Sequence, residues 1–300
     1  MAKKQLTNKD TKLVIAISSR ALFNLDESHQ IYKDQGVEAY AKHQQENEDV
    51  VLNPGVGFTL VKKLLALNSE KTPIDVILLS RNSADTGLRI FNSIEHYGLN
   101  ISKAAFTRGE STHPFVGAFE ADLFLSSNYH DVQKALESGF AAASIVESKS
   151  DNVHPSQLRI AFDGDAVIFS DESERIFQEH GLEAFEENEK QSANIELKAG
   201  PFKSFLASLQ KIQSTFPEEN NPIRTALVTA RSAPSHKRVF HTMRQWGIRI
   251  DEAFFLGGLE KGVFLREFAA DIFFDDQHQH CRSASQYVST GHVPTGLKNQ

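Results

Sequence analysis

The sequence contains only one cysteine, Cys281, and lacks other features that would mark it as a secreted or membrane protein. A single cysteine cannot form a disulfide within the chain, which excludes the small disulfide-stabilised folds. No apolar run approaches the length of a membrane-spanning helix, and Met1–Asp10 lacks the apolar core of a signal peptide. We therefore expect a cytoplasmic protein with no membrane partner.

The sequence also lacks an excess of positive charge. The formal net charge is -7 and the sequence pI is about 6.0. A protein that binds a nucleic acid polymer normally carries a basic surface, so this class of partner is not expected. A small phosphate ester needs only a local positive site. With 300 residues, of which 40% are hydrophobic, we expect either two domains or one large α/β unit.

The two halves of the sequence repeat one another. Leu13–Ser28 aligns with Leu158–Ser173 without a gap, and Ser80–Asn128 aligns in the same way with Thr229–Gln277. Identical residues recur through both alignments, and the apolar runs follow in the same order. We therefore expect two duplicated lobes, 1–150 and 151–300.

Short apolar runs separated by helix-length segments predict parallel strands joined by helices. In the first half the strands are expected near Leu13–Ile17, Val76–Ser80, Ala104–Thr107, Asp122–Leu125 and Ala142–Val146. In the second half they are expected near Leu158–Phe162, Thr225–Thr229, Ala253–Leu256, Asp271–Phe274 and Tyr287–Thr290. The predicted fold class is α/β, with two Rossmann-like lobes and mostly parallel sheets.

Three further segments have distinct patterns. Ser235–Trp246 is amphipathic and is followed by Gly247, which predicts a helix with a glycine C-cap. Ser148–Ser156 is polar and predicts a linker between the lobes. Residues 171–198 follow the first strand of the second half and are rich in acidic side chains, most of which should face solvent. Each half carries such an insert after its first strand, so we expect a helical cap-type insert in each lobe, with a small cap around residues 170–200 in the second.

Polar residues follow the predicted strands of the second half, where ligands of open α/β sheets bind. In chain order they are Asp163, Asp165, Thr229, Lys261, Asp275 and Asp276. The aligned residues of the first half are Ser18, Arg20, Ser80, Thr112, Ser126 and Ser127. The first half therefore lacks every carboxylate and the lysine. We expect the second half to be catalytic and the first half to be a degenerate copy.

The residue types in the second half match the needs of phosphoryl transfer. Asp163 is the expected nucleophile, because carboxylate attack on phosphorus divides ester hydrolysis into two easier displacements. Asp165 is the expected acid and base. Charge balance calls for Mg²⁺, which we place at Asp163, the backbone carbonyl of Asp165, and Asp275.

Other residues are expected to bind the phosphate or to support the site. Thr229 offers a hydroxyl, Ala230 follows it with a backbone N–H, and Lys261 offers a compact positive charge. Arg231 could contact the phosphate or cap a helix. Asp276 could support the site from behind or, like Asp275, cap a helix.

The strings AFDGDAVIFSDESE, LVTARSAPS, IDEAFFLGG and FFDDQ resemble the cytosolic 5'-nucleotidase I family, within the haloacid dehalogenase (HAD) superfamily of phosphohydrolases. The resemblance extends from Leu13 to about Leu297 and includes SSRALF in the first half. It implies Mg²⁺-dependent hydrolysis of nucleoside 5'-monophosphates, with AMP a leading substrate in the animal members of the family. A nucleotide is then the small-molecule partner, and a homo-oligomer remains open.

Two alternatives stay open from the residues alone. The chain could be a phosphatase for another small phosphomonoester, or a nucleotide-binding regulator whose first half holds the ligand. Phe169, Phe202 and Phe205 could stack on a base, although a core role is the more common one for phenylalanine. His278 and His280 lack the surrounding ligands of a zinc site and are expected at the surface or behind the site.

Overall fold

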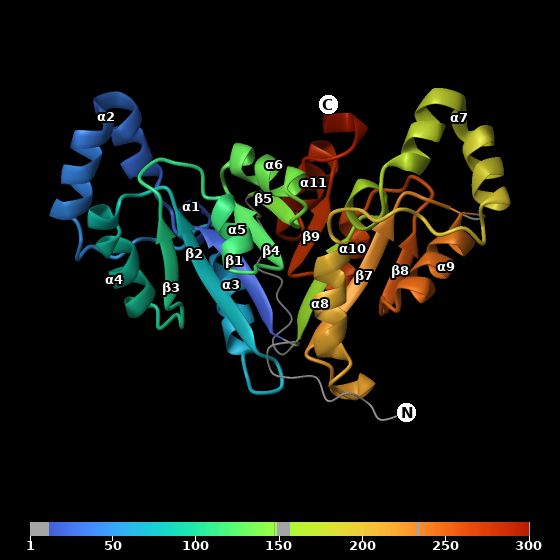
Figure 1. Cartoon of the computed structure of the whole chain (residues 1–300), viewed down its shortest axis with the longest axis horizontal. Helices are drawn as coiled ribbons and strands as arrows, with labels where there is room; N and C mark the ends of the chain where they lie inside the picture. The colour runs from blue at the N-terminus through green and yellow to red at the C-terminus, as the bar shows by residue number, and fades with distance from the viewer. Residues whose placement is uncertain (1–11, 147, 149–156, 233–234, 300) are drawn as a thin grey trace.

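The computed structural model describes residues 12–146, 148, 157–232 and 235–299, and it contains a ten-stranded sheet with helices on both faces (Figure 1). The strands of the first half are β1 (Leu13–Ser18), β2 (Ile74–Ser80), β3 (Lys103–Phe106), β4 (Leu123–Ser126) and β5 (Ala142–Val146). Those of the second half are β6 (Leu158–Phe162), β7 (Ile223–Thr229), β8 (Glu252–Phe255), β9 (Ile272–Asp275) and β10 (Thr290–His292). The predicted linker Ser148–Ser156 lies outside the described residues, except for Ser148.

Helices connect the strands in both halves. The first half contains α1 (Ser19–Leu22), α2 (Asp26–Glu46), α3 (Phe58–Ala66), α4 (Leu88–His96), α5 (Pro114–Ala118) and α6 (Tyr129–Glu137). The second half contains α7 (Glu172–Gln191), α8 (Lys203–Gln213), α9 (His236–Trp246), α10 (Gly262–Phe268) and α11 (His278–Ala284). Short helical turns lie at η1 (Ala84–Thr86), η2 (Gly164–Ile168), η3 (Glu218–Asn220) and η4 (Leu297–Asn299).

The strand order is β3-β2-β1-β4-β5-β10-β9-β6-β7-β8. Neighbouring strands are parallel except at the centre, where β5 and β10 pair antiparallel. From one edge to the centre the order is β3, β2, β1, β4, β5, and from the other edge to the centre it is β8, β7, β6, β9, β10. Each strand of the first list corresponds to the strand at the same place in the second, so the two halves have the same strand order. The α/β class and the mostly parallel sheet are confirmed, and the two halves share one sheet.

Most strands begin and end close to their predicted positions, but the prediction for the last one was wrong. That strand was expected near Tyr287–Thr290, whereas β10 begins at Thr290. The backbone N–H groups of Tyr287 and Val288 both donate to the carbonyl of Ala284, which closes the end of α11. Val288 is buried against α10 and α11. The apolar residues before β10 thus pack on helices instead of entering the sheet. By contrast, α9 confirms the predicted helix and ends at Gly247, whose φ is 64°.

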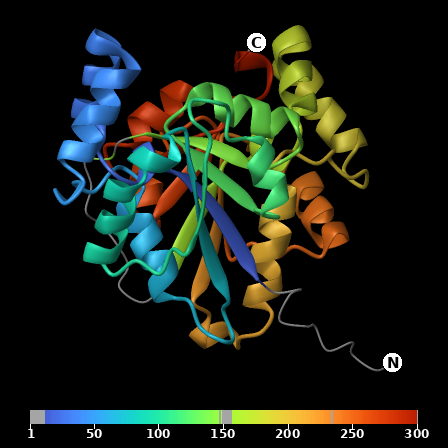
Figure 2. The ribbon, with the colours of Figure 1, turned by 60° about the vertical axis from the view of Figure 1, so that its left-hand side comes forward.

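Both faces of the sheet are buried, as expected for parallel strands covered by helices. On one face, Leu13, Ile15 and Ile17 of β1 belong to a single core that continues across both halves beneath α3, α4, α8 and α9. The alternate side chains, Val14 and Ala16, face a separate core beneath α5 and α6. A third core beneath α10 and α11 covers that face of the second half. Figure 2 shows the helices on both sides of the sheet.

Two matched polar contacts connect the halves. Lys63 on α3 donates to both carboxylate oxygens of Asp271, at 2.6 Å each. Ser208 on α8 pairs with Lys63 when the first repeat alignment is continued at the same spacing, and it donates to Asp122 at 2.6 Å. Asp122 in turn aligns with Asp271. Each helix therefore contacts the acid that precedes a strand of the other half. These contacts add side-chain links to the antiparallel pairing of β5 with β10.

The predicted insert of the second half forms α7, and its counterpart in the first half is α2. Each of these helices bends at a glycine with positive φ, at Gly36 (85°) and Gly181 (81°), a conformation that costs glycine little. Figures 1 and 2 both show α2 and α7 standing out from the sheet on opposite sides of the molecule. In the part of the chain that the structure describes, no helix combines the length and apolar character needed to cross a bilayer.

Candidate active site

Asp163 lies directly after β6, at the edge of the sheet. Its backbone N–H donates to the carbonyl of Phe274 in β9 at 2.8 Å, which continues the pairing of the two strands beyond their regular ladder. This contact fixes the main chain of Asp163 at the edge of the sheet, and the residue is almost fully buried. Positioning of this kind meets the geometric demand on a nucleophile.

Ala166 and Gly164 have different roles in the turn after Asp163. The residue with left-handed backbone angles is Ala166, with φ of 60°, and not Gly164. A Cβ atom at Gly164 would lie 3.3 Å from the hydroxyl oxygen of Thr229. The glycine therefore allows β7 to approach the turn closely. Thr229, at the end of β7, also accepts the backbone N–H of Arg231 at 3.2 Å.

Lys261 bridges two buried carboxylates. Its Nζ lies 2.8 Å from Oδ1 of Asp163 and 2.6 Å from Oδ2 of Asp275. The same Asp275 oxygen lies 3.2 Å from Nδ1 of His280, and the other accepts the backbone N–H of Gln277 at 2.8 Å. Asp275 thus has partners on both oxygens, and the lysine connects it to the expected nucleophile.

Burial and charge shift the pKa values of these groups in different directions. Burial is the largest influence on Asp163 and, with the negative charge of Asp275, raises its pKa to about 6 against the opposing effect of Lys261. Burial also disfavours the charged form of Asp275, but Lys261 and His280 outweigh it and lower the pKa to about 2. Burial opposes the charge of Lys261, and the two carboxylates outweigh it, so its pKa is above the usual range.

Asp276 completes a cluster of three carboxylates. Asp163, Asp275 and Asp276 each offer an oxygen within 4.8 Å of the others. Asp276 is fully buried, and neither of its carboxylate oxygens has a hydrogen-bond partner among the described residues. Burial, followed by the charges of Asp163 and Asp275, raises its pKa to about 9. Such a group is costly to bury without a partner, and carboxylate oxygens are preferred ligands of Mg²⁺. The cluster therefore fits a divalent cation.

The side chain of Asp165 lies apart from this cluster. Arg231 binds both of its carboxylate oxygens, at 2.8 and 2.6 Å, in a bidentate ion pair. The metal set expected from the sequence included Asp165 through its backbone carbonyl, and that contact stays a prediction. Asp276, assigned only a supporting role, is the third carboxylate that the fold gathers. The side chain of Asp165 is instead held at the rim, where it can face a substrate.

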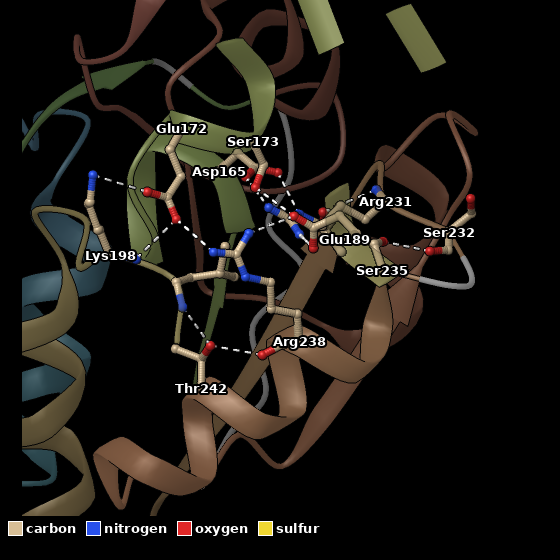
Figure 3. A network of polar contacts seen from close by, with 12 residues as sticks. Asp165, Glu172, Ser173, Glu189, Lys198, Arg231, Ser232, Ser235, Arg238 and Thr242 are labelled. Atoms are coloured by element: carbon tan, nitrogen blue, oxygen red, sulfur yellow. Dashed lines mark hydrogen bonds and ion pairs between the residues drawn. The ribbon is translucent and has the colours of Figure 1, made fainter. Parts of the chain in front are cut away.

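Arg231 extends the Asp165 contact into a buried network, shown in Figure 3. Its Nη1 donates at 2.8 Å to Glu189 of α7, whose other oxygen accepts from Arg238 at 2.9 Å and from Ser173 at 2.9 Å. Burial opposes the charge of Arg231, but Asp165 and Glu189 outweigh it and raise its pKa. The orientation of Asp165 is therefore tied to the position of α7.

Glu189 was missed by the sequence interpretation, which assigned most acids of residues 171–198 to solvent. Its residue exposure is only 1%. The sequence did contain a signal for the burial of Glu189. When the alignment of Leu13–Ser28 with Leu158–Ser173 is continued without a gap, Glu189 pairs with Gln44. Gln44 is equally buried and accepts hydrogen bonds from Ser28 and Arg89, the counterparts of Ser173 and Arg238.

A cavity of about 280 Å³, the catalytic pocket, opens beside these groups. The predicted phosphate-binding residues Thr229, Ala230 and Lys261 line it together with Asp163 and Asp165. From the other side α7 contributes aromatic and apolar side chains, namely Phe177, Leu182 and Phe185. The pocket thus combines a charged end with an apolar wall.

The aromatic wall differs from the residues considered in the sequence. Phe169, Phe202 and Phe205 are buried in the core, so the core interpretation is confirmed. The rings of Phe177 and Phe185 instead face the catalytic pocket, with centroids 6.3 Å apart and nearly perpendicular planes. Phe177 is 48% exposed, and an exposed aromatic face of this kind can stack on a base.

Comparison with known proteins places the chain in a family. A model of the 5'-nucleotidase family matches residues 5–300. The human protein named cytosolic 5'-nucleotidase 1B is 40% identical over 291 residues, which cover 92% of this chain and 48% of the human one. The chain thus spans about half the length of this curated relative, and no solved structure matches it. With a family match over nearly its whole length, the chain belongs to the 5'-nucleotidase family.

Proposed function

We propose that this protein hydrolyses nucleoside 5'-monophosphates, AMP among them, to a nucleoside and inorganic phosphate. The observation that carries the proposal is the convergence of Asp163, Lys261, Asp275 and Asp276 beside a pocket with an aromatic wall. The name of the human relative supports the same activity and a cytosolic location. Residues 151–300 are the catalytic HAD-like lobe, α7 is its cap, and residues 1–150 are a degenerate copy.

Asp163 is the proposed nucleophile. Its carboxylate oxygen attacks phosphorus, the bond between phosphorus and the ester oxygen breaks, and an aspartyl-phosphate forms. Asp165 gives a proton to the departing oxygen and then takes one from the water that attacks the aspartyl-phosphate. This second attack releases inorganic phosphate and restores Asp163. Arg231 keeps Asp165 directed at the pocket between these steps.

The positive groups of the site bind the phosphate. Lys261 already contacts Asp163, so its charge lies where the phosphoryl group must approach. Thr229 and Ala230 line the same end of the pocket and supply a hydroxyl and a backbone N–H. Mg²⁺, held by Asp163, Asp275 and Asp276, would supply the charge that neutralises the phosphate oxygens.

Phosphate release from a panel of phosphomonoesters tests the proposal. We expect nucleoside 5'-monophosphates to be hydrolysed faster than sugar phosphates, with activity lost in EDTA and restored by Mg²⁺. Faster release from sugar phosphates would favour a phosphatase for other small esters. Binding of AMP without any release would favour a regulator.

The role of Asp276 can be tested separately from catalysis. We expect Asp276→Asn to change the Tm of the metal-free protein little. The pKa of this buried carboxyl is raised to about 9, so at neutral pH it is largely uncharged, as an amide is. The rise in Tm on adding Mg²⁺ should be lost, since a neutral amide is a weaker ligand. Asp34→Asn, an exposed acid on α2, should keep the full rise. An unchanged Mg²⁺ effect in Asp276→Asn would remove this residue from the metal set. Differential scanning fluorimetry measures both.

A further inference from the structure

The first half of the molecule contains a second cavity, of about 370 Å³, which we call the first-half pocket. Tyr32, Tyr40 and Asn82 line it, and these residues align with Phe177, Phe185 and Arg231 of the catalytic pocket. The two cavities are therefore built from corresponding elements. Its volume is within the range of about 300–1,000 Å³ seen for small-molecule sites.

The charge of the first-half pocket is opposite to that of the catalytic pocket. Arg20 and Arg81 line it, where the second half has Asp165 and Ala230. A third arginine, Arg108, takes the place of a glycine. No carboxylate is found among the described residues that line the first-half pocket. Three arginines around one cavity favour an anionic ligand, and guanidinium groups match phosphate geometry.

The arginines differ in how firmly they are held. Arg81 donates two hydrogen bonds to buried Asp131, at 2.9 and 2.7 Å, yet its side chain stays 37% exposed. Arg20 pairs with exposed Asp26 at 3.0 Å, a contact that solvent weakens. The side chain of Arg108 has no hydrogen-bond or ion-pair partner within the described part of the chain. One arginine is thus preorganised, and two can turn toward a ligand.

Aromatic rings also line the first-half pocket. Tyr32 and Tyr40 lie nearly perpendicular, with ring centroids 6.2 Å apart, and the ring of His29 stacks on Tyr32 at 6.2 Å. Tyr32 is 49% exposed, so its ring is accessible. This pair corresponds to Phe177 and Phe185 of the catalytic pocket. Flat aromatic faces in a cavity that also contains positive charge suit a planar base attached to a phosphate.

The walls of the first-half pocket are also held rigidly. Tyr40 donates to the side chain of Asn82 at 2.8 Å and accepts from Gln44 at 3.1 Å. Gln44 in turn accepts from buried Arg89 at 3.1 Å. This network ties α2 to the sheet in the way that Glu189 ties α7. The cavity is therefore a formed site with no catalytic carboxylate.

We propose that the first-half pocket binds a nucleotide without hydrolysing it. The arginines hold the phosphate, and the tyrosine wall holds the base. The site lacks a counterpart of Asp163, because Ser18 stands there and accepts backbone N–H groups from Ala21 and Ser127. The choice of a nucleotide as ligand class rests on the proposed function, whereas the presence of an anion site rests on the pocket alone.

Equilibrium dialysis with labelled AMP tests the proposal in the full chain. An Asp163→Asn background prevents turnover during the measurement. In this background we expect Arg20→Ser and Arg108→Gly each to weaken the binding of one AMP about tenfold, the order expected for one charged hydrogen bond. Glycine tolerates the φ of 50° at position 108. Inorganic phosphate should compete for this site, and adenosine should bind it more weakly than AMP.

The control is Arg244→Ala, an exposed arginine of α9 that lines neither pocket. It should leave all AMP binding unchanged. If Arg20→Ser and Arg108→Gly both bind AMP as tightly as the background protein, the proposal is overturned, even when the unmodified protein hydrolyses AMP. If the unmodified protein releases no phosphate but the arginine variants still lose bound AMP, the first-half site stands and the proposed function fails.

Discussion

Replacing Asp163 with asparagine is expected to lower kcat for phosphate release by about a thousandfold or more, because an amide cannot attack phosphorus. The substitution keeps the size and shape of the side chain. The backbone contact of residue 163 with Phe274 is also retained, so the sheet edge should be undisturbed. Steady-state phosphate release from AMP in the presence of Mg²⁺ measures the loss.

The first half offers a matched control for this experiment. Ser18 occupies the position aligned with Asp163 and lines neither pocket. Ser18→Ala should therefore leave hydrolysis unchanged. Acid quenching during turnover should also trap a phosphorylated protein in the unmodified chain and none in Asp163→Asn. Undiminished turnover by Asp163→Asn would place the nucleophile elsewhere.

Local patterns explain why much of the site could be predicted. Asp163 and Thr229 directly follow or end apolar strands, and strand ends are encoded by a few neighbouring residues. The repeat added a second source of information, because Ser18 and Ser80 mark the same sites without the chemistry. Such signals need no knowledge of tertiary contacts.

Tertiary contacts decided the rest. Glu189 lies in an acidic run that looks solvated, and only its contacts with Arg231 and Arg238 bury it. Local pattern revealed neither the place of Asp276 as the third clustered carboxylate nor the ion pair of Asp165 with Arg231, which lies far away in the sequence. Likewise, nothing local indicates that β5 and β10 pair and join both halves in one sheet.

Glu189→Gln is expected to reduce the free energy of unfolding by about 3 kcal/mol, the lower end of the cost of breaking a buried ion pair. Glutamine keeps an oxygen for hydrogen bonding but loses the charge that balances Arg231 and Arg238. Both guanidinium groups are nearly buried, so solvent cannot compensate. Urea unfolding measured at equilibrium gives the change.

The first half contains a version of this network in which Arg89 remains but the ion pair between Glu189 and Arg231 has no counterpart, and it supplies the control. In the first half, Gln44 stands in the place of Glu189 and Asn82 in the place of Arg231. The hydroxyl of Tyr40 connects Gln44 to Asn82, because it accepts from Gln44 and donates to Asn82. Asn82 carries no charge that needs balancing. We therefore expect Glu189→Gln combined with Arg231→Asn to regain much of the stability that Glu189→Gln loses.

Adding Phe185→Tyr to this pair should recover more stability, because tyrosine at position 185 restores the hydroxyl that Tyr40 supplies in the first half. Hydrolysis should nevertheless stay low in the double and triple variants, since Arg231→Asn removes the arginine that holds both oxygens of Asp165. Stability and activity would thus separate, which a purely structural role for the network does not predict. If the double variant is less stable than Glu189→Gln alone, Glu189 is not the charge that balances Arg231. If the triple variant is fully active, Arg231 does not orient Asp165.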